Sequence, residues 1–76
     1  MNKERRKQID EAISKANDLK DEIESILNDE EEYKDNMPEN LQASAKYEKA
    51  EAACESLQTV VDALEEAVSN LEEAQQ

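Results

Sequence analysis

The apolar residues of this chain recur at alternating steps of three and four over two long stretches, and this spacing limits the fold more than any other feature. Steps of this size return to one face of an α-helix, because the helix has about 3.6 residues per turn. The first stretch therefore predicts an amphipathic helix over residues 2–34, although Glu30 stands where the next apolar residue is due. Its repeating residues are Ile9, Ala12, Ala16, Leu19, Ile23, Ile26 and Tyr33, with Ile13 and Leu27 beside them.

The second stretch predicts a helix over residues 44–75. The sequence LEEA begins at Leu64 and again at Leu71, seven residues later, and seven is the period of a left-handed coiled coil. The repeating residues are Tyr47, Ala50, Ala53, Leu57, Val60, Leu64, Ala67, Leu71 and Ala74, with Cys54, Val61 and Val68 beside them.

The sequence DNMPENLQAS, which begins at Asp35, separates the two stretches and holds the only proline. Pro38 disfavours a helical backbone at Met37 and fits the first turn of a new helix. Ser44 is the residue best suited to accept a hydrogen bond from the first turn of the second helix. We therefore expect a corner over residues 35–43, with Ser44 as the cap of the helix that follows.

Two helices of roughly 30 residues are each about 45 Å long, so they can pack along each other over their full length. Residues 1–20 carry six basic against four acidic side chains, a net charge of +2, and residues 21–76 carry three against 17, a net charge of −14. An antiparallel arrangement brings the basic start beside the acidic end of the second helix. The predicted fold is all-α, a coiled-coil-like antiparallel two-helix hairpin that forms a single domain, 1–76.

A single hairpin of this composition offers little core, because each helix faces water over most of its circumference and many of the repeating residues are alanine. Self-association into a four-helix bundle would cover the apolar stripes from a second direction. We therefore expect a homodimer or a higher oligomer. The expected oligomer core is formed by Ile9, Leu19, Ile23, Ile26, Leu57, Val60, Leu64 and Leu71.

The chain lacks the residues that the common kinds of catalytic site require. There is no histidine for a His-based triad or a usual zinc site, and no glycine for a phosphate-binding loop. The acidic run NDEEEYKD lacks the spaced ligands and the glycine of a calcium-binding loop. We expect no enzyme, no metal and no cofactor.

The net charge of −12 is the feature that points most directly to a partner. Such a surface attracts a basic macromolecule, by our expectation a protein, and repels nucleic acid despite the short basic run KERRK near the start. Once the basic start is neutralised by the second helix, the remaining acids lie in the corner half. The predicted partner-binding residues are Glu30, Glu31, Glu32, Tyr33, Asp35, Asn36, Met37, Glu39, Asn40 and Tyr47.

Three functional classes fit these features. A protein-interaction module would use the bulky corner residues Tyr33, Met37, Leu41 and Tyr47, which can otherwise serve only as a plug that seals the end of the bundle. A mimic of nucleic acid would use the carboxylates alone, and acidity can also serve solubility in a purely structural module. A small-ligand binder, for example of a signalling nucleotide, would need the cluster of Arg5, Arg6 and Lys7.

No stretch of about 18 apolar residues could cross a bilayer and no segment has the pattern of a signal peptide, so we expect a cytoplasmic protein without a membrane partner. Cys54 is the only cysteine and has alanines beside it. With no histidine to activate it and Glu55 next to it, we expect a small packed side chain and not a reactive thiol.

The residues from Asp35 to Ala74 resemble a segment of small uncharacterised helical proteins of bacteriophages, prophages and other mobile elements. In those proteins PENLQ is followed by a serine, a tyrosine and a helix rich in LEEA, as it is here from Pro38 through Ser44 and Tyr47. The resemblance implies a phage or mobile-element origin and, by analogy, a small inhibitor of a host or defence protein, while the acidic surface itself favours a basic partner that handles nucleic acid. It implies no catalytic residue.

Overall fold

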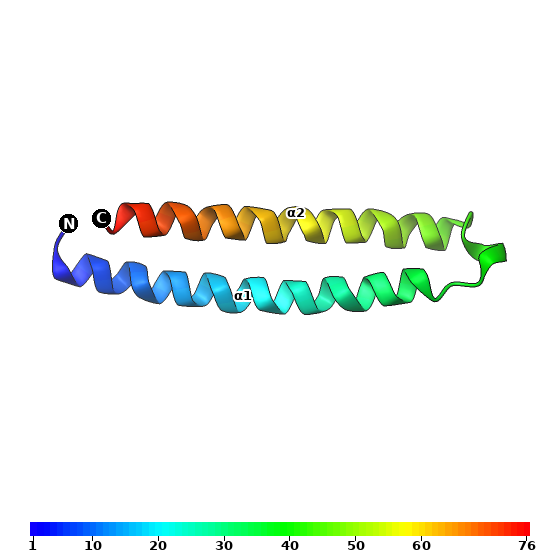
Figure 1. The fold of residues 1–76 in the computed structure, drawn as a ribbon, viewed down its shortest axis with the longest axis horizontal. Helices are drawn as coiled ribbons and strands as arrows, with labels where there is room; N and C mark the ends of the chain where they lie inside the picture. Colours follow the sequence, from blue (N-terminus) through cyan, green and yellow to red (C-terminus); the bar gives the residue numbers. More distant parts are fainter.

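The two predicted helices are both present and lie antiparallel along each other. In the computed structural model, which describes residues 1–76, α1 runs Lys3–Asp35, a short 3-10 helix η1 follows at Glu39–Leu41, and α2 runs Ala45–Ala74. Both chain ends lie at one end of the hairpin and the corner lies at the other (Figure 1). The all-α hairpin expected from the sequence is thus confirmed, with a length of 59 Å.

Each long helix begins at a side chain that accepts a hydrogen bond from its first turn. Asn2 Oδ1 accepts from the Arg5 amide at 2.8 Å, and Ser44 Oγ accepts from the Tyr47 amide at 3.4 Å. These bonds satisfy amide groups that have no partner inside the helix. Ser44 is therefore the cap that the sequence predicted.

The corner reverses the chain through successive tight turns. The Met37 amide still donates to the Lys34 carbonyl at 3.2 Å, but Pro38 is extended, with φ −55° and ψ 146°, and stops α1. Beyond it, the Leu41 amide donates to the Pro38 carbonyl at 2.8 Å, and the Ser44 amide donates to the Leu41 carbonyl at 3.0 Å. The reversal needs no residue with positive φ.

The residues that face the other helix follow steps of three and four in both helices, as in a coiled coil. We call these residues the seam. The seam consists of Ile9, Ile13, Ala16, Lys20, Ile23, Leu27, Glu30 and Lys34 in α1, and of Tyr47, Ala50, Cys54, Leu57, Val61, Leu64, Val68, Leu71 and Gln75 in α2.

The structure corrects the sequence analysis at pairs of adjacent apolar residues. Leu27 is 6% exposed and Ile26 is 46% exposed, and Val61 is 3% exposed where Val60 is 41% exposed. The sequence periodicity predicts the reverse, with Ile26 and Val60 in the main stripe and Leu27 and Val61 beside it. The reason is that the apolar stripe of each helix is wide enough to contact two other helices, whereas a hairpin provides each helix with only one packing partner.

Candidate functional site

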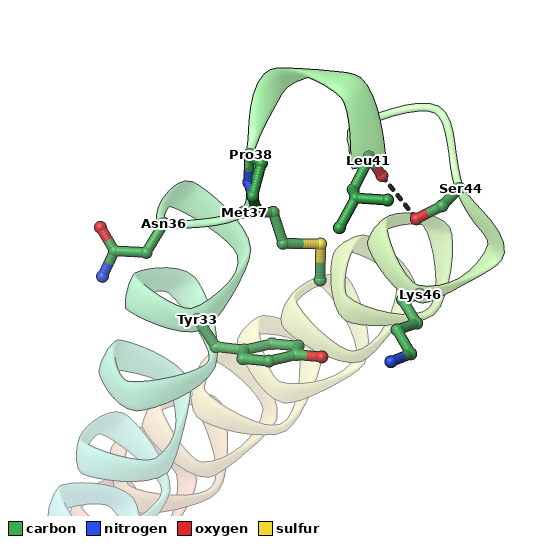
Figure 2. Close-up of a pocket in the computed structure, with 7 residues that line it drawn as sticks. All are labelled: Tyr33, Asn36, Met37, Pro38, Leu41, Ser44 and Lys46. Atoms are coloured by element: carbon green, nitrogen blue, oxygen red, sulfur yellow. Dashed lines mark hydrogen bonds between the residues drawn. The ribbon is translucent and has the colours of Figure 1, made fainter.

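The corner carries an open pocket of about 380 Å³. Its apolar wall is formed by Met37 and Leu41, and the Tyr33 ring lies below them, as Figure 2 shows. Met37 is 9% exposed, because its side chain points into the angle between the end of α1 and η1. Tyr33 and Leu41 remain 52% and 44% exposed. An outside partner can therefore contact the Tyr33 ring and Leu41, whereas Met37 is buried within the corner.

The polar groups around this pocket are few. Ser44 Oγ donates to the Leu41 carbonyl at 2.5 Å and also caps α2, so this hydroxyl is already engaged (Figure 2). Asn36 points its amide away from the pocket, and Lys46 brings the one charged group to its rim. The pocket can hold an apolar or aromatic group beside a cation, but it lacks converging donors for a small polar ligand.

The two sides of the hairpin differ in chemistry. Two antiparallel helices are related by a two-fold axis normal to the plane that holds them, so equivalent positions of both helices face the same side of that plane. On one side, which we call the apolar side, lie Ala12, Leu19, Ile26 and Tyr33 of α1 and Ala53, Val60, Ala67 and Ala74 of α2. On the other, which we call the acidic side, lie Asp10, Asn17, Glu24 and Glu31 of α1 and Glu51, Gln58, Glu65 and Glu72 of α2.

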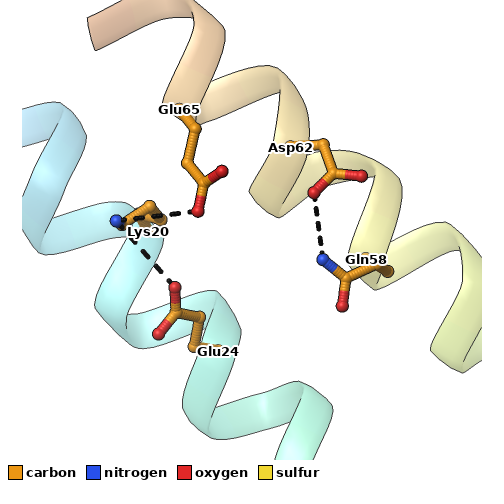
Figure 3. A network of polar contacts seen from close by, with 5 residues as sticks. All are labelled: Lys20, Glu24, Gln58, Asp62 and Glu65. Carbon is orange, nitrogen blue, oxygen red and sulfur yellow. Dashed lines mark hydrogen bonds and ion pairs between the residues drawn. The ribbon is translucent and has the colours of Figure 1, made fainter.

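The acidic side contains the only ion pairs of the hairpin. Lys20 Nζ extends from the seam to Glu24 Oε1 at 4.0 Å and to Glu65 Oε1 at 3.9 Å (Figure 3). Further along α2, Gln58 Nε2 donates to Asp62 Oδ1 at 3.0 Å. Since Lys20 reaches only these two acids, 19 of the 21 carboxylates have no cation within 4.0 Å.

The sequence predicts that the basic residues at the start of α1 pair with the acids at the end of α2, but the structure shows only one such ion pair. Of the charges expected to meet there, only Lys20 and Glu65 come within 4.0 Å. The open end of the hairpin is closed instead by Gln75, whose Nε2 donates to the Arg6 carbonyl at 3.3 Å and also to Asp10 Oδ1. The acids of α2 therefore keep most of their charge exposed.

The predicted partner-binding residues fall into two groups. Six of them are exposed acids or amides at the end of α1 and in the corner, namely Glu31, Glu32, Asp35, Asn36, Glu39 and Asn40. Tyr33 is exposed with them, whereas Glu30 and Tyr47 are half-buried in the seam and Met37 is buried. Tyr47 belongs to the cluster of bulky corner residues predicted from the sequence, but it does not line the corner pocket.

The predicted oligomer-core residues also divide into two groups. Five of them, Ile9, Ile23, Leu57, Leu64 and Leu71, are half-buried in the seam between the two helices of one chain. Leu19, Ile26 and Val60 lie on the apolar side, where no part of the same chain covers them. Sequence reasoning missed Lys46 and Pro38 as lining residues of the corner pocket.

Cys54 lies in the seam and is 8% exposed. Burial raises the pKa of its thiol, and the carboxylates of Glu31, Glu30 and Asp35 act in the same direction, although the ammonium of Lys34 opposes them. A buried thiol with a raised pKa is a poor nucleophile. The expectation of a packed side chain is supported by this placement.

Comparison with family models, with curated proteins and with solved structures gives no match for this chain. No three acidic or cysteine side chains are placed to share a metal ion. No helix contains an apolar stretch long enough to cross a membrane. The features that bear on function are therefore the two sides and the corner of the hairpin.

Proposed function

We propose that this protein acts by binding and not by catalysis, that it self-associates into a four-helix bundle, and that it holds a basic protein on the carboxylates of its corner half. The resemblance of residues 35–74 to phage and mobile-element proteins supports a partner in a host-defence system, and the net charge of −12 supports a basic partner that handles nucleic acid. Binding of this kind would inhibit the partner by occupying its basic surface.

The observation that carries the proposal is the number of carboxylates without a cation. Nineteen of the 21 carboxylates have no cation within 4.0 Å, so they form no ion pair that stabilises the hairpin. Exposed ion pairs contribute only about 0–1 kcal/mol each to stability, so a fold gains little from so many acids. A complementary basic surface would gain attraction and a faster association rate.

The corner half is the place where this charge meets an apolar anchor. Glu31, Glu32 and Asp35 are exposed on the last turns of α1, and Leu41 is 44% exposed in the corner beside them, on the wall of the pocket. An exposed apolar side chain rimmed by charge matches the anatomy of protein interfaces, which have an apolar centre and a polar rim. This combination favours a protein partner over simple solubility.

The test is a capture experiment with charge-reversed variants. The hairpin is immobilised, proteins are captured from a lysate of a bacterial host at about 0.1 M and about 1 M NaCl, and the bound proteins are identified by mass spectrometry. We expect basic proteins at low salt and their loss at high salt, because the Debye length falls from about 10 Å to about 3 Å.

The matched variants separate the two ends of the hairpin. Glu31, Glu32 and Asp35 are replaced by lysine in one variant, and Glu66, Glu72 and Glu73 in the other; all six are exposed. These sets avoid Glu30 in the seam and Glu65, which pairs with Lys20. The corner variant should lose the partner and the other should keep it. Equal losses, or capture that ignores salt, would contradict the proposal.

A further inference from the structure

The apolar side of the hairpin is an uncovered hydrophobic strip. Leu19 is 45% exposed, Ile26 46%, Tyr33 52% and Val60 41%, and Ala12, Ala53, Ala67 and Ala74 extend the strip beyond them. These residues lie at seven-residue intervals over 12–33 of α1 and 53–74 of α2, so the strip is about 32 Å long. Contiguous apolar surface of this kind marks an interaction site on a soluble protein.

The total surface of the hairpin is too large for a compact monomer. A compact protein of 8.6 kDa exposes roughly 4,700 Å², whereas this hairpin exposes 5694 Å². The excess is about 1,000 Å², and a standard interface buries about 800 Å² of each partner. One further helical layer of the same size would therefore bring the chain to the exposure of an ordinary globular protein.

We infer that a second copy of this chain covers the apolar side in an antiparallel orientation, so that the corner of each copy lies against the chain ends of the other. This inference rests on the self-association in the proposed function, and it adds the face and the orientation. The result is a four-helix bundle in which every helix has two antiparallel neighbours.

Charge decides between the two symmetric ways of placing one apolar side on another. If both corners lay at the same end, the two carboxylate-rich corner halves would share one end of the bundle, and the basic starts would share the other. The antiparallel orientation instead brings Lys3, Arg5 and Lys7 of one copy to the corner of the second copy. Opposite charges then meet at both ends of the bundle.

Side-chain size fits the same orientation. A two-fold axis midway between Leu19 and Ile26 places Leu19 of one copy opposite Ile26 of the second copy, and Ala12 opposite Tyr33. Each large side chain thus meets a smaller or a matching one, which allows the two layers to pack without voids.

Two exposed charges beside the strip acquire partners in this arrangement. Lys15 and Asp29 both flank the apolar side, and neither has an ion partner in the hairpin. They are 14 residues apart on one helix, or about 21 Å, so they cannot meet within one chain. The antiparallel dimer brings Lys15 of each copy level with Asp29 of the second copy.

The first test is the mass in solution of adjacent variants. By light scattering at micromolar concentration, we expect twice the mass of 8.6 kDa for the natural sequence and for Ser25→Glu, which faces away from the strip. Ile26→Glu should give a monomer or an unfolded chain. A monomeric mass for the folded natural sequence would overturn the inference, and would mean that a different partner covers the strip.

The second test fixes the orientation without a variant that threatens the fold. Lys15→Glu and Asp29→Lys should each weaken dimerisation about tenfold, because two symmetric attractions become repulsions, and the double variant should restore it. A double variant as weak as the sum of the single ones would overturn the antiparallel orientation.

A distance between two labels provides an independent check of the orientation. Cys54→Ala with Gln42→Cys carries one spin label at each corner, and pulsed electron paramagnetic resonance measures their separation in the dimer. We expect more than about 40 Å, since the corners lie at opposite ends, and a value below about 20 Å would overturn the orientation. Because these tests use the pure protein, their failure leaves the proposed binding of a basic partner to be judged by its own capture experiment.

Discussion

Lys20 of α1 and Glu65 of α2 form the only ion pair that joins the two helices, with 3.9 Å between Nζ and Oε1. The lysine occupies a seam position, where its neighbours along the seam are alanine and isoleucine. Its ammonium reaches Glu24 and Glu65 of the acidic side, as Figure 3 shows, and its side chain is 25% exposed. The pair is partly exposed, so its contribution to stability is small.

Lys20→Leu should therefore leave the hairpin as stable or make it more stable, by up to about 1.5 kcal/mol, because an apolar seam residue replaces a weak ion pair. Urea denaturation followed by circular dichroism measures the change. Glu65→Gln is the control, which removes the pair without altering the seam and should change the stability by less than about 0.5 kcal/mol. A loss above about 1 kcal/mol in Lys20→Leu would show that the ion pair holds the helices together.

Cys54 gives the fold a pH dependence that can be isolated by one substitution. Burial raises the pKa of its thiol above the ordinary value of 9.0, so the folded state binds this proton more tightly than the unfolded state. The resulting stability is fully present below pH 9.0 and is lost as the pH rises toward the folded pKa.

Cys54→Ala should cost under about 1.5 kcal/mol at neutral pH, since a small side chain replaces another small one. It should also lose less stability than the natural sequence between about pH 8 and about pH 10.5, because the variant has no thiol to ionise. Every other ionisable side chain is present in both proteins, so the difference between them reports the thiol alone. Identical losses would contradict the burial of Cys54.

The sequence was sufficient to predict the helices, the corner and the cap at Ser44, because these depend on local signals: heptad spacing, proline and a hydroxyl. It was insufficient to decide between adjacent apolar residues such as Ile26 and Leu27. Both positions fit a helical period, and the choice depends on which side of the helix meets its neighbour. The seam was also hard to identify from the sequence because it includes the polar residues Lys20, Glu30 and Lys34, which an apolar pattern does not predict to be buried.

The corner shows the same limit. The sequence identified Tyr33, Met37 and Leu41 as a cluster, and the structure places all three around one pocket. Tyr47 was expected beside them because Tyr33 and Tyr47 flank the corner, 35–43, on its two sides. Its place in the seam is set by the heptad register of α2, which runs from Tyr47 through Ala50 and Cys54. Distance along the chain from a turn does not determine which way a side chain faces.

Glu22 provides a test that only the antiparallel dimer predicts. It flanks the apolar side close to the proposed two-fold axis, so it would lie near Glu22 of the second copy. Glu22→Gln removes this repulsion and should tighten the dimer by about twofold to fivefold, measured by sedimentation equilibrium. Asp18→Asn is the control on an exposed position away from the axis, and should have a smaller effect. A dimer weakened by Glu22→Gln would contradict the predicted position of the axis.

Salt should affect the fold and the proposed binding of a partner in opposite directions. With a net charge of −12 and only two ion pairs, repulsion among the carboxylates outweighs attraction in the hairpin. Raising NaCl from about 0.01 M to about 1 M shortens the Debye length from about 30 Å to about 3 Å, so we expect the melting temperature to rise by several degrees. Replacing Glu31, Glu32 and Asp35 by their amides should reduce the rise in melting temperature, because less repulsion remains to be screened.

The capture of a basic partner should weaken over the same range of salt. A melting temperature that falls with salt would instead show that attractive pairs such as Lys20 and Glu65 dominate the electrostatics of the fold.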